Sequence, residues 1–216
     1  RWAAEEAGVK INTDCAVQEI LVQDGRTHGL LLVNGQTISA DQVLSCIDPK
    51  ATFLKLLGPA SIDPDLRNRI AGLNTQVGCC KFLAATNALP QWTGWDGDPD
   101  LPARGAVQLE MTRESVCLAH EQTKAGIPPK RPMMSVNVPS SLDPNLAPAG
   151  HHTISVYVYP APAKPATDNW DDHREAVAQG IIDQITEYAP NFRNSVLHYE
   201  LRTPLDLERK VGLTDG

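Results

Sequence analysis

The alternation of apolar and polar residues near the start of the chain predicts a strand, a three-stranded meander and a return strand over residues 8–49. Two apolar runs, residues 17–22 and 30–33, have the length and composition of half-buried strands. The pairs Asp24-Gly25 and Asn34-Gly35 lie between such runs, and both pairs tolerate the positive φ angles of tight hairpins. The segment is therefore expected to end in a return strand followed by a polar turn.

After residue 49 the pattern changes to strands separated by single helices. This order predicts an α+β domain with a mixed β-sheet that helices cover on one face. Residues 87–104 are rich in Pro, Gly, Asp and Trp and predict a loop. The expected helices lie at residues 50–58, 65–72 and 113–125, and the expected strands at residues 76–86, 106–110, 133–138, 153–159 and 196–201.

Two further helices carry start and stop signals. The longer one is expected to begin after Thr167 or Asp168 as N-cap and to end before Pro190. Its apolar face comprises Val177, Ile181, Ile185 and Tyr188. The last helix is expected to have Thr203 as its N-cap and Asp206 at its third position, with Glu208 and Arg209 available to pair with neighbouring loops.

Charge and composition narrow the class of protein. The 216 residues carry a net charge of −7, which argues against a nucleic-acid partner because phosphate binding needs clustered Lys and Arg. No apolar run approaches the roughly 20 residues that span a bilayer. The five cysteines include no Cys-x-x-Cys pair, so we expect buried free thiols in a reducing compartment, either the cytoplasm or, in a eukaryote, the mitochondrion.

Several segments resemble one family. The strand, meander and return strand resemble the end of the FAD-binding domain in flavoproteins with two dinucleotide-binding domains. The segments at residues 139–151, 188–192 and 203–216 are similar to those of the phytoene-dehydrogenase-like FAD-dependent oxidoreductases, in the amine oxidase and phytoene desaturase superfamily. Lys81 and Ala85 match the Lys-x-x-x-Ala pattern of that family's first long substrate-domain strand.

The resemblance implies an internal fragment. The chain contains no Gly-x-Gly-x-x-Gly motif, whose glycines bring the backbone against the pyrophosphate of a dinucleotide. Residues 1–49 would then be a partial, Rossmann-like FAD-binding domain, and residues 50–216 the substrate-binding domain. The missing part of the FAD-binding domain would be the partner of this piece, and the fragment alone is expected to retain no FAD and to be inactive.

The resemblance also implies a small set of cofactor contacts. The residue matching Val17 places its backbone against the adenine of FAD. The turn matching Ser45, Cys46, Asp48 and Pro49 lies beside the dinucleotide. This placement agrees with the gathering of ligands at the carboxyl ends of strands in such sheets. Cys46 stands where many relatives have a small polar residue such as Asn, so its side chain is a weaker candidate than its backbone.

The expected function is hydride removal from, or desaturation of, a largely apolar small molecule that lies between the substrate-domain sheet and the flavin. Because the flavin performs the redox step, no catalytic residue or metal is required in this segment. His198 on the last strand is a candidate pocket wall, and a homodimer through the face toward the flavin domain is a further hypothesis. Two alternatives stay open: a non-catalytic binding or assembly module of the same fold, and a hydrolase that uses Ser140, Ser141 or Cys46.

Overall fold

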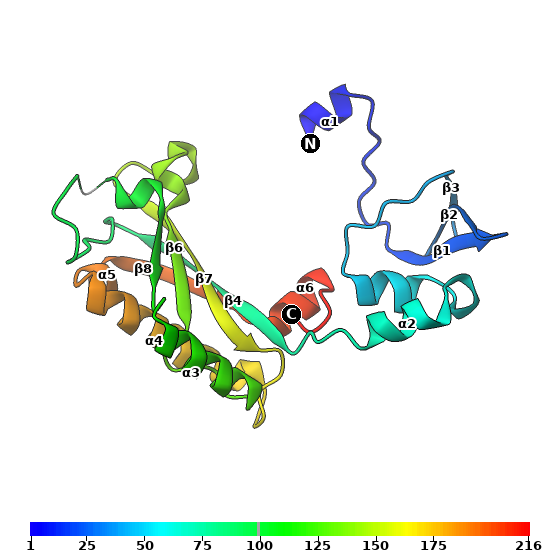
Figure 1. Cartoon of the computed structure of the whole chain (residues 1–216). Helices are drawn as coiled ribbons and strands as arrows, with labels where there is room; N and C mark the ends of the chain where they lie inside the picture. Colours follow the sequence, from blue (N-terminus) through cyan, green and yellow to red (C-terminus); the bar gives the residue numbers. More distant parts are fainter. Residues whose placement is uncertain (99) are drawn as a thin grey trace. The chain divides into compact units, whose positions relative to one another are not determined.

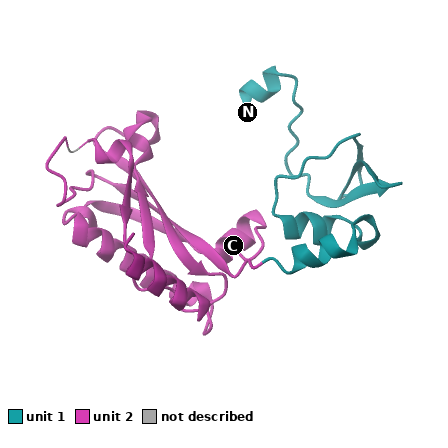
Figure 2. Ribbon diagram, in the orientation of Figure 1, with its two compact units in different colours: residues 1–73 teal, residues 74–216 magenta. Residues whose placement is uncertain are grey.

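The computed structural model describes residues 1–98 and 100–216, which form two compact units (Figure 2). Unit 1 comprises residues 1–73, and unit 2 comprises residues 74–216. The predicted boundary after Pro49 falls inside unit 1, where four later residues are buried: Ala51, Thr52, Ile62 and Ile70. The assignment of the two predicted parts to a FAD domain and a substrate domain stays a prediction.

Unit 1 contains the predicted meander. Its antiparallel sheet has the order β1 (Val17–Gln23), β2 (Arg26–Leu32) and β3 (Thr37–Ser39) (Figure 1). Asp24 and Gly25 have φ angles of 50° and 74°, because a two-residue hairpin that follows the twist of its strands needs positive φ at both positions. The hairpins were therefore predictable from their turn residues.

Short helices complete unit 1. They are α1 (Trp2–Glu6), the π-helix η1 (Ala51–Leu56), the 3-10 helix η2 (Pro59–Ser61) and α2 (Pro64–Ala71). The helix expected at residues 50–58 is present as a π-helix of six residues. Asp63 caps α2 because its carboxylate accepts a hydrogen bond from the Leu66 N–H at 3.0 Å.

The strands expected on either side of the meander do not form. Residues 9–14 and 41–47 belong to no sheet. A strand needs a neighbour for its backbone hydrogen bonds, and within residues 1–98 and 100–216 no strand pairs with either segment. The Rossmann-like character of this unit accordingly stays a prediction.

Unit 2 is built on a five-stranded sheet. Its order is β5 (Ala106–Leu109), β6 (Met133–Asn137), β7 (His152–Pro162), β4 (Val77–Thr86) and β8 (Val196–Arg202). Every neighbouring pair is antiparallel, so the prediction of a mixed sheet was wrong. The connection from β7 to β8 skips the place occupied by β4, and no two parallel strands therefore become neighbours.

Helices and short turns connect the strands of this sheet. The α-helices are α3 (Arg113–Lys124), α4 (Trp170–Tyr188), α5 (Phe192–Ser195) and α6 (Pro204–Val211), and the 3-10 helices are η3 (Pro102–Arg104), η4 (Pro139–Ser141) and η5 (Pro144–Leu146). The predicted loop at residues 87–104 holds η3, while its residue Pro99 lies outside the described residues. Within the described chain no helix combines the length and apolar composition of a bilayer-spanning segment.

The N-cap of α4 differs from both predicted candidates. Asn169 caps the helix, because its side-chain oxygen accepts from the Asp171 N–H at 2.7 Å. The Asp172 carboxylate accepts in return from the Asn169 N–H at 3.2 Å. Asp168 instead adopts a positive φ of 59°, which makes it part of the preceding turn.

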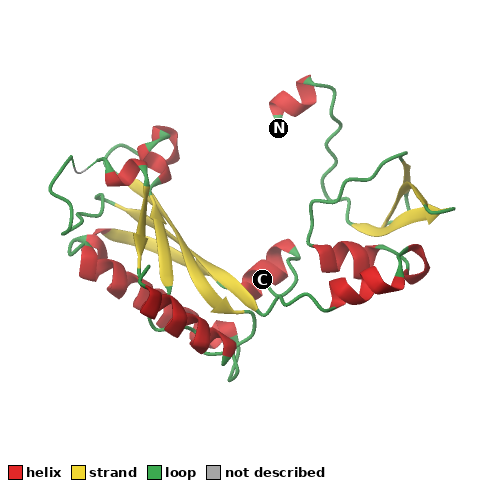
Figure 3. Ribbon diagram, viewed as in Figure 1, coloured by secondary structure: helices red, strands yellow, loops and turns green. Residues whose placement is uncertain are grey.

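One face of the unit 2 sheet forms the core. Alternate residues of β4, β6 and β7 are buried there, and α4 and α5 lie over them (Figure 3). The core includes Phe82, Val136, Val156, Ile181 and Ile185, all at most 1% exposed. The strict alternation places the intervening residues of the same strands on the opposite face of the sheet.

Candidate functional site

The opposite face of the unit 2 sheet carries the main candidate site, and we call it the open face. The side chains that the register of the strands places there include Lys81, Leu83, Ala85, Ser135, Asn137, Thr153, Ser155, Tyr157, His198, Glu200 and Arg202. All of them are half-buried or exposed, including those on the central strands β6, β7 and β4. α3 contacts this face at Tyr159, where His120 packs edge-on against the tyrosine ring with centroids 5.6 Å apart.

A pocket of about 460 Å³ lies on the open face. Its floor is formed by Leu83 and Ala85 of β4 with Thr153 and Ser155 of β7, and Leu146 of η5 lies at its side. The apolar side chains of β4 thus meet an apolar side chain from a loop, with the hydroxyl side chains of β7 beside them. A pocket of this size and lining suits a small, largely apolar ligand.

Two ionisable side chains of β8 line the same pocket. They are His198, the pocket-wall candidate from the sequence, and Glu200. The Arg202 guanidinium donates to Glu200 at 3.1 Å and keeps the pKa of that carboxyl below its usual range, with a further contribution from Lys210. Glu200 is therefore an ionised but already paired carboxylate.

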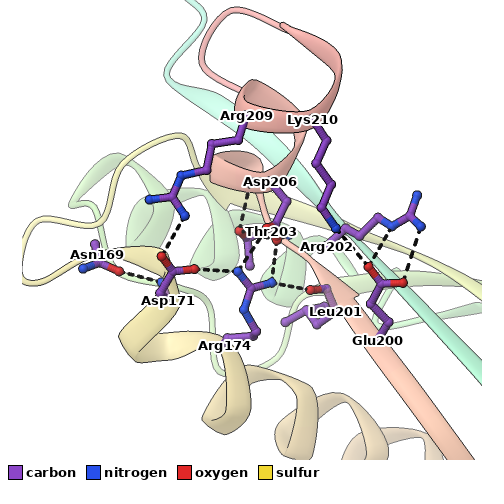
Figure 4. Close-up of polar contacts among 10 residues, drawn as sticks. All are labelled: Asn169, Asp171, Arg174, Glu200, Leu201, Arg202, Thr203, Asp206, Arg209 and Lys210. Atoms are coloured by element: carbon purple, nitrogen blue, oxygen red, sulfur yellow. Dashed lines mark hydrogen bonds and ion pairs between the residues drawn. The ribbon is translucent and has the colours of Figure 1, made fainter.

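A second polar cluster holds α4, β8 and α6 together (Figure 4). The Arg174 guanidinium donates to the Leu201 carbonyl at 2.6 Å, to the Asp206 carboxylate at 2.5 Å and to the Asp171 carboxylate at 2.6 Å. Arg209 also donates to Asp171, at 2.8 Å. Arg209 therefore pairs with the first turn of α4, whereas the sequence had suggested a pairing with a neighbouring loop.

Asp206 is the most restricted carboxylate of this cluster. It lies at the third position of α6, as predicted, and accepts from the Thr203 N–H at 2.9 Å in a reciprocal capping box. Burial alone would raise the pKa of Asp206, but Arg174 and the two donors of Thr203 together lower it to about 2. The cluster has all its partners within the protein, so it is a structural lock and not a ligand site.

The residues that the resemblance assigns to FAD lie in unit 1. Ser45 and Pro49 line a pocket of about 390 Å³, together with Ile20 and Thr27 of the meander and Phe53 of η1. The Ser45 hydroxyl is already hydrogen-bonded to the Thr52 hydroxyl at 2.7 Å.

The other three assigned residues do not line this pocket. Val17 opens β1 and is half-buried, while the Cys46 side chain is exposed. The Asp48 carboxylate accepts from the Ala51 N–H at 2.9 Å, so it supports the start of η1. The structure thus brings Ser45 and Pro49 together and gives Asp48 a local structural role.

Several alternative sites lack the geometry that they need. Among the described residues no group of three or more His, Cys, Asp or Glu is arranged to hold a metal ion. All five cysteines are free, but only Cys80 is fully buried, so the expectation of buried thiols was wrong for exposed Cys46 and Cys117. The Ser140 hydroxyl accepts from the Thr153 N–H at 3.0 Å and supports the loop above the pocket.

Sequence reasoning missed most of the pocket. Leu83, Leu146, Ser155 and Glu200 were not singled out, although the period-two alternation of β4 and β7 already separated two faces. Which of the two faces a helix covers depends on packing between distant segments. The position of Leu146 over the sheet depends on the path of a loop, which the sequence pattern does not fix.

Comparisons with known proteins agree with the resemblance. The chain is 35% identical to the pyridine nucleotide-disulfide oxidoreductase domain-containing protein 2 of Rattus norvegicus, over 99% of this chain and 38% of that protein. It is 25% identical to the zeta-carotene-forming phytoene desaturase of Myxococcus xanthus, over 99% of this chain and 38% of that protein. The chain therefore spans less than half the length of these relatives.

Solved structures support the fold. A crystal structure of an oxidoreductase from Methanosarcina mazei matches with a TM-score of 0.60 and 20% identity, over 91% of this chain and 39% of that chain. The PF1083 protein of Pyrococcus furiosus matches with a TM-score of 0.54 and 16% identity, over 92% of this chain and 39% of that chain. The likeness at this identity concerns the fold alone.

The family model for flavin-containing amine oxidoreductases matches residues 1–203. Its description as flavin-containing implies FAD as the cofactor of the full-length protein. The match covers unit 1, unit 2 as far as residue 203, and every strand of both sheets. The chain belongs to the flavin-containing amine oxidoreductase family.

Proposed function

We propose that this chain supplies the substrate-binding surface of a FAD-dependent oxidoreductase or desaturase that acts on a largely apolar small molecule. The pocket of about 460 Å³ on the open face is the observation that carries the proposal. Leu83, Ala85 and Leu146 provide apolar surface that a substrate would cover. Burial of that surface contributes roughly 25 cal/mol for each Å² removed from water and excludes water from the reacting bond.

FAD would supply the redox step by accepting a hydride from the bound substrate. In unit 1, Ser45 and Pro49 would form a wall beside the dinucleotide, with Val17, Cys46 and Asp48 near it. The described lining of their pocket includes no Lys or Arg, so it fits an apolar ring of the cofactor better than its phosphates. We expect the phosphate-binding glycines in a part of the protein that this chain does not contain, and we expect the chain alone to be inactive.

The same proposal specifies how the chain would meet the flavin, the substrate and a second copy of itself. The open face would be turned toward the flavin, with the substrate between the ring and the sheet. A homodimer and a reducing compartment, cytoplasmic or mitochondrial, remain parts of the proposal. Light scattering at high protein concentration tests the dimer, because a monomeric mass would count against it.

A substitution that fills the pocket tests the substrate-binding role. Ala85 is exposed at the pocket floor, and Ala85→Trp would occupy space that an apolar ligand needs. We expect the variant to bind the neutral apolar dye Nile red about tenfold more weakly, which corresponds to roughly 1.4 kcal/mol. Binding is measured by dye fluorescence with this chain.

Ala125→Trp is the matched control, because Ala125 is an exposed residue at the end of α3 and does not line the pocket. It should bind the dye like the unchanged chain. Equal dye binding by the Ala85→Trp variant and the unchanged chain would contradict the proposed use of this pocket.

A further inference from the structure

One row of side chains across the open face consists of polar groups. The strand register aligns its five members, one from each strand, in the order Arg202, Lys81, Tyr157, Ser135 and Gln108. All five side chains can donate hydrogen bonds. The next row along the sheet contains Leu83 and Ser155, which line the apolar pocket.

The charge of this row is concentrated at Lys81. Arg202 is paired with the Glu200 carboxylate at 3.1 Å. Within residues 1–98 and 100–216, the Lys81 ammonium makes no ion pair, although the residue is half-buried. A partly desolvated cation without a counter-charge gains more from an anionic ligand than a solvated one does.

Tyr157 and Ser135 are both able to donate beside Lys81. Burial, with the neighbouring Cys79 thiol, raises the pKa of Tyr157 to about 12, so its hydroxyl keeps its proton at neutral pH. The Ser135 hydroxyl accepts from the Gln108 amide at 2.9 Å, which leaves its own proton free to donate. Tyr157 is 43% exposed and stacks on Tyr159, with ring centroids 6.3 Å apart.

The polar row adjoins the apolar pocket. Lys81 and Leu83 are two residues apart on β4 and project from the same face, which separates them by about 7 Å along the strand. A molecule with one anionic end and an apolar chain would therefore meet donors and apolar surface in succession. A cationic head group is less suited to the site, because the only carboxylate among the described pocket-lining residues, Glu200, is already paired with Arg202 and Lys210.

We propose that the open face binds an amphipathic carboxylate, with its carboxylate on Lys81, Tyr157 and Ser135 and its apolar chain in the pocket at Leu83, Ala85 and Leu146. This inference rests on the proposed function and adds the chemical class of the substrate. The carboxylate would be fixed by one charge-assisted and two neutral hydrogen bonds. Lys81, Tyr157 and Ser135 act here as binding and orienting groups.

Calorimetric titration of the chain with octanoate and with octan-1-ol tests the proposal, because the two probes share an apolar chain and differ in charge. We expect octanoate to bind about tenfold more tightly than the alcohol. Lys81→Met should remove that difference and leave the affinity for the alcohol unchanged. Tyr157→Phe should weaken octanoate binding by a smaller factor.

Lys164→Met is the matched control, since Lys164 is exposed on the segment after β7 and the substitution removes the same charge. It should bind both probes like the unchanged chain. Equal affinities for octanoate and octanol, or an equal loss of both in Lys81→Met, would overturn the carboxylate site while leaving the apolar pocket in place. Failure of both probes to bind would overturn the pocket as well.

Discussion

At the scale of single residues, Asp206 shows how a short motif acquires a long-range role. The Thr203–Asp206 capping box is local and can be read from the sequence. Its contact with Arg174, 32 positions earlier, requires the folded arrangement of α4 and α6. The same carboxylate therefore caps one helix and anchors another.

Asp206→Asn is expected to destabilise the protein by about 2 kcal/mol at pH 7, because Arg174 would lose the more buried of its two anionic partners and keep only the more exposed Asp171. Asp183→Asn removes an ion pair whose aspartate is 67% exposed and should cost less than about 1 kcal/mol. Urea unfolding of the two variants and the unchanged chain measures both costs. A cost of Asp206→Asn no larger than that of Asp183→Asn would contradict the proposed lock.

The low pKa of Asp206 makes the unfolding free energy of the protein depend on pH. The pKa of Asp206 is about 2 in the folded chain, below its ordinary value in an unfolded chain of about 4. Its stabilisation is therefore fully present above about pH 4 and is lost as the pH falls through about 2. The difference in unfolding free energy between the unchanged chain and Asp206→Asn should shrink over that interval. A difference that stays constant down to pH 2 would contradict the assigned pKa.

At the scale of elements, local patterns predicted most strands and helices but not their neighbours. The meander hairpins and the strands of unit 2 follow from turn residues and apolar runs. The segments at residues 9–14 and 41–47 did not become strands, because strand formation depends on a partner that lies elsewhere. The antiparallel sheet was mistaken for a mixed one because the strand order is a property of the whole unit.

The packing of α4 on the core face of the sheet leads to a prediction about stability. Ile185 is fully buried against the sheet, so Ile185→Ala should cost about 2–5 kcal/mol through lost burial and a residual cavity. Leu118 on α3 is 55% exposed, and Leu118→Ala should change stability by less than about 0.5 kcal/mol. Thermal unfolding of both variants and of the unchanged chain measures the two losses of stability. Similar costs at the two positions would show that α4 does not cover the core face as described.

At the scale of the whole molecule, family and site were predictable to different degrees. Segments spread along the chain pointed to the family, and the family model covers residues 1–203. The pocket and the polar row arise from strand register, which joins residues as distant as Lys81 and Arg202. No local pattern encodes that register, so the site could be located only in the folded chain.

We propose that this chain is the substrate-binding part of a flavoprotein. Visible absorption spectra of this chain and of the protein at the full length of its relatives test that proposal. We expect the absorption band of oxidised flavin in the longer protein and its absence from this chain. Stoichiometric flavin in this chain would contradict the assignment of the phosphate site to another part of the protein. Absence of flavin from both would contradict the oxidoreductase and favour a non-catalytic binding module.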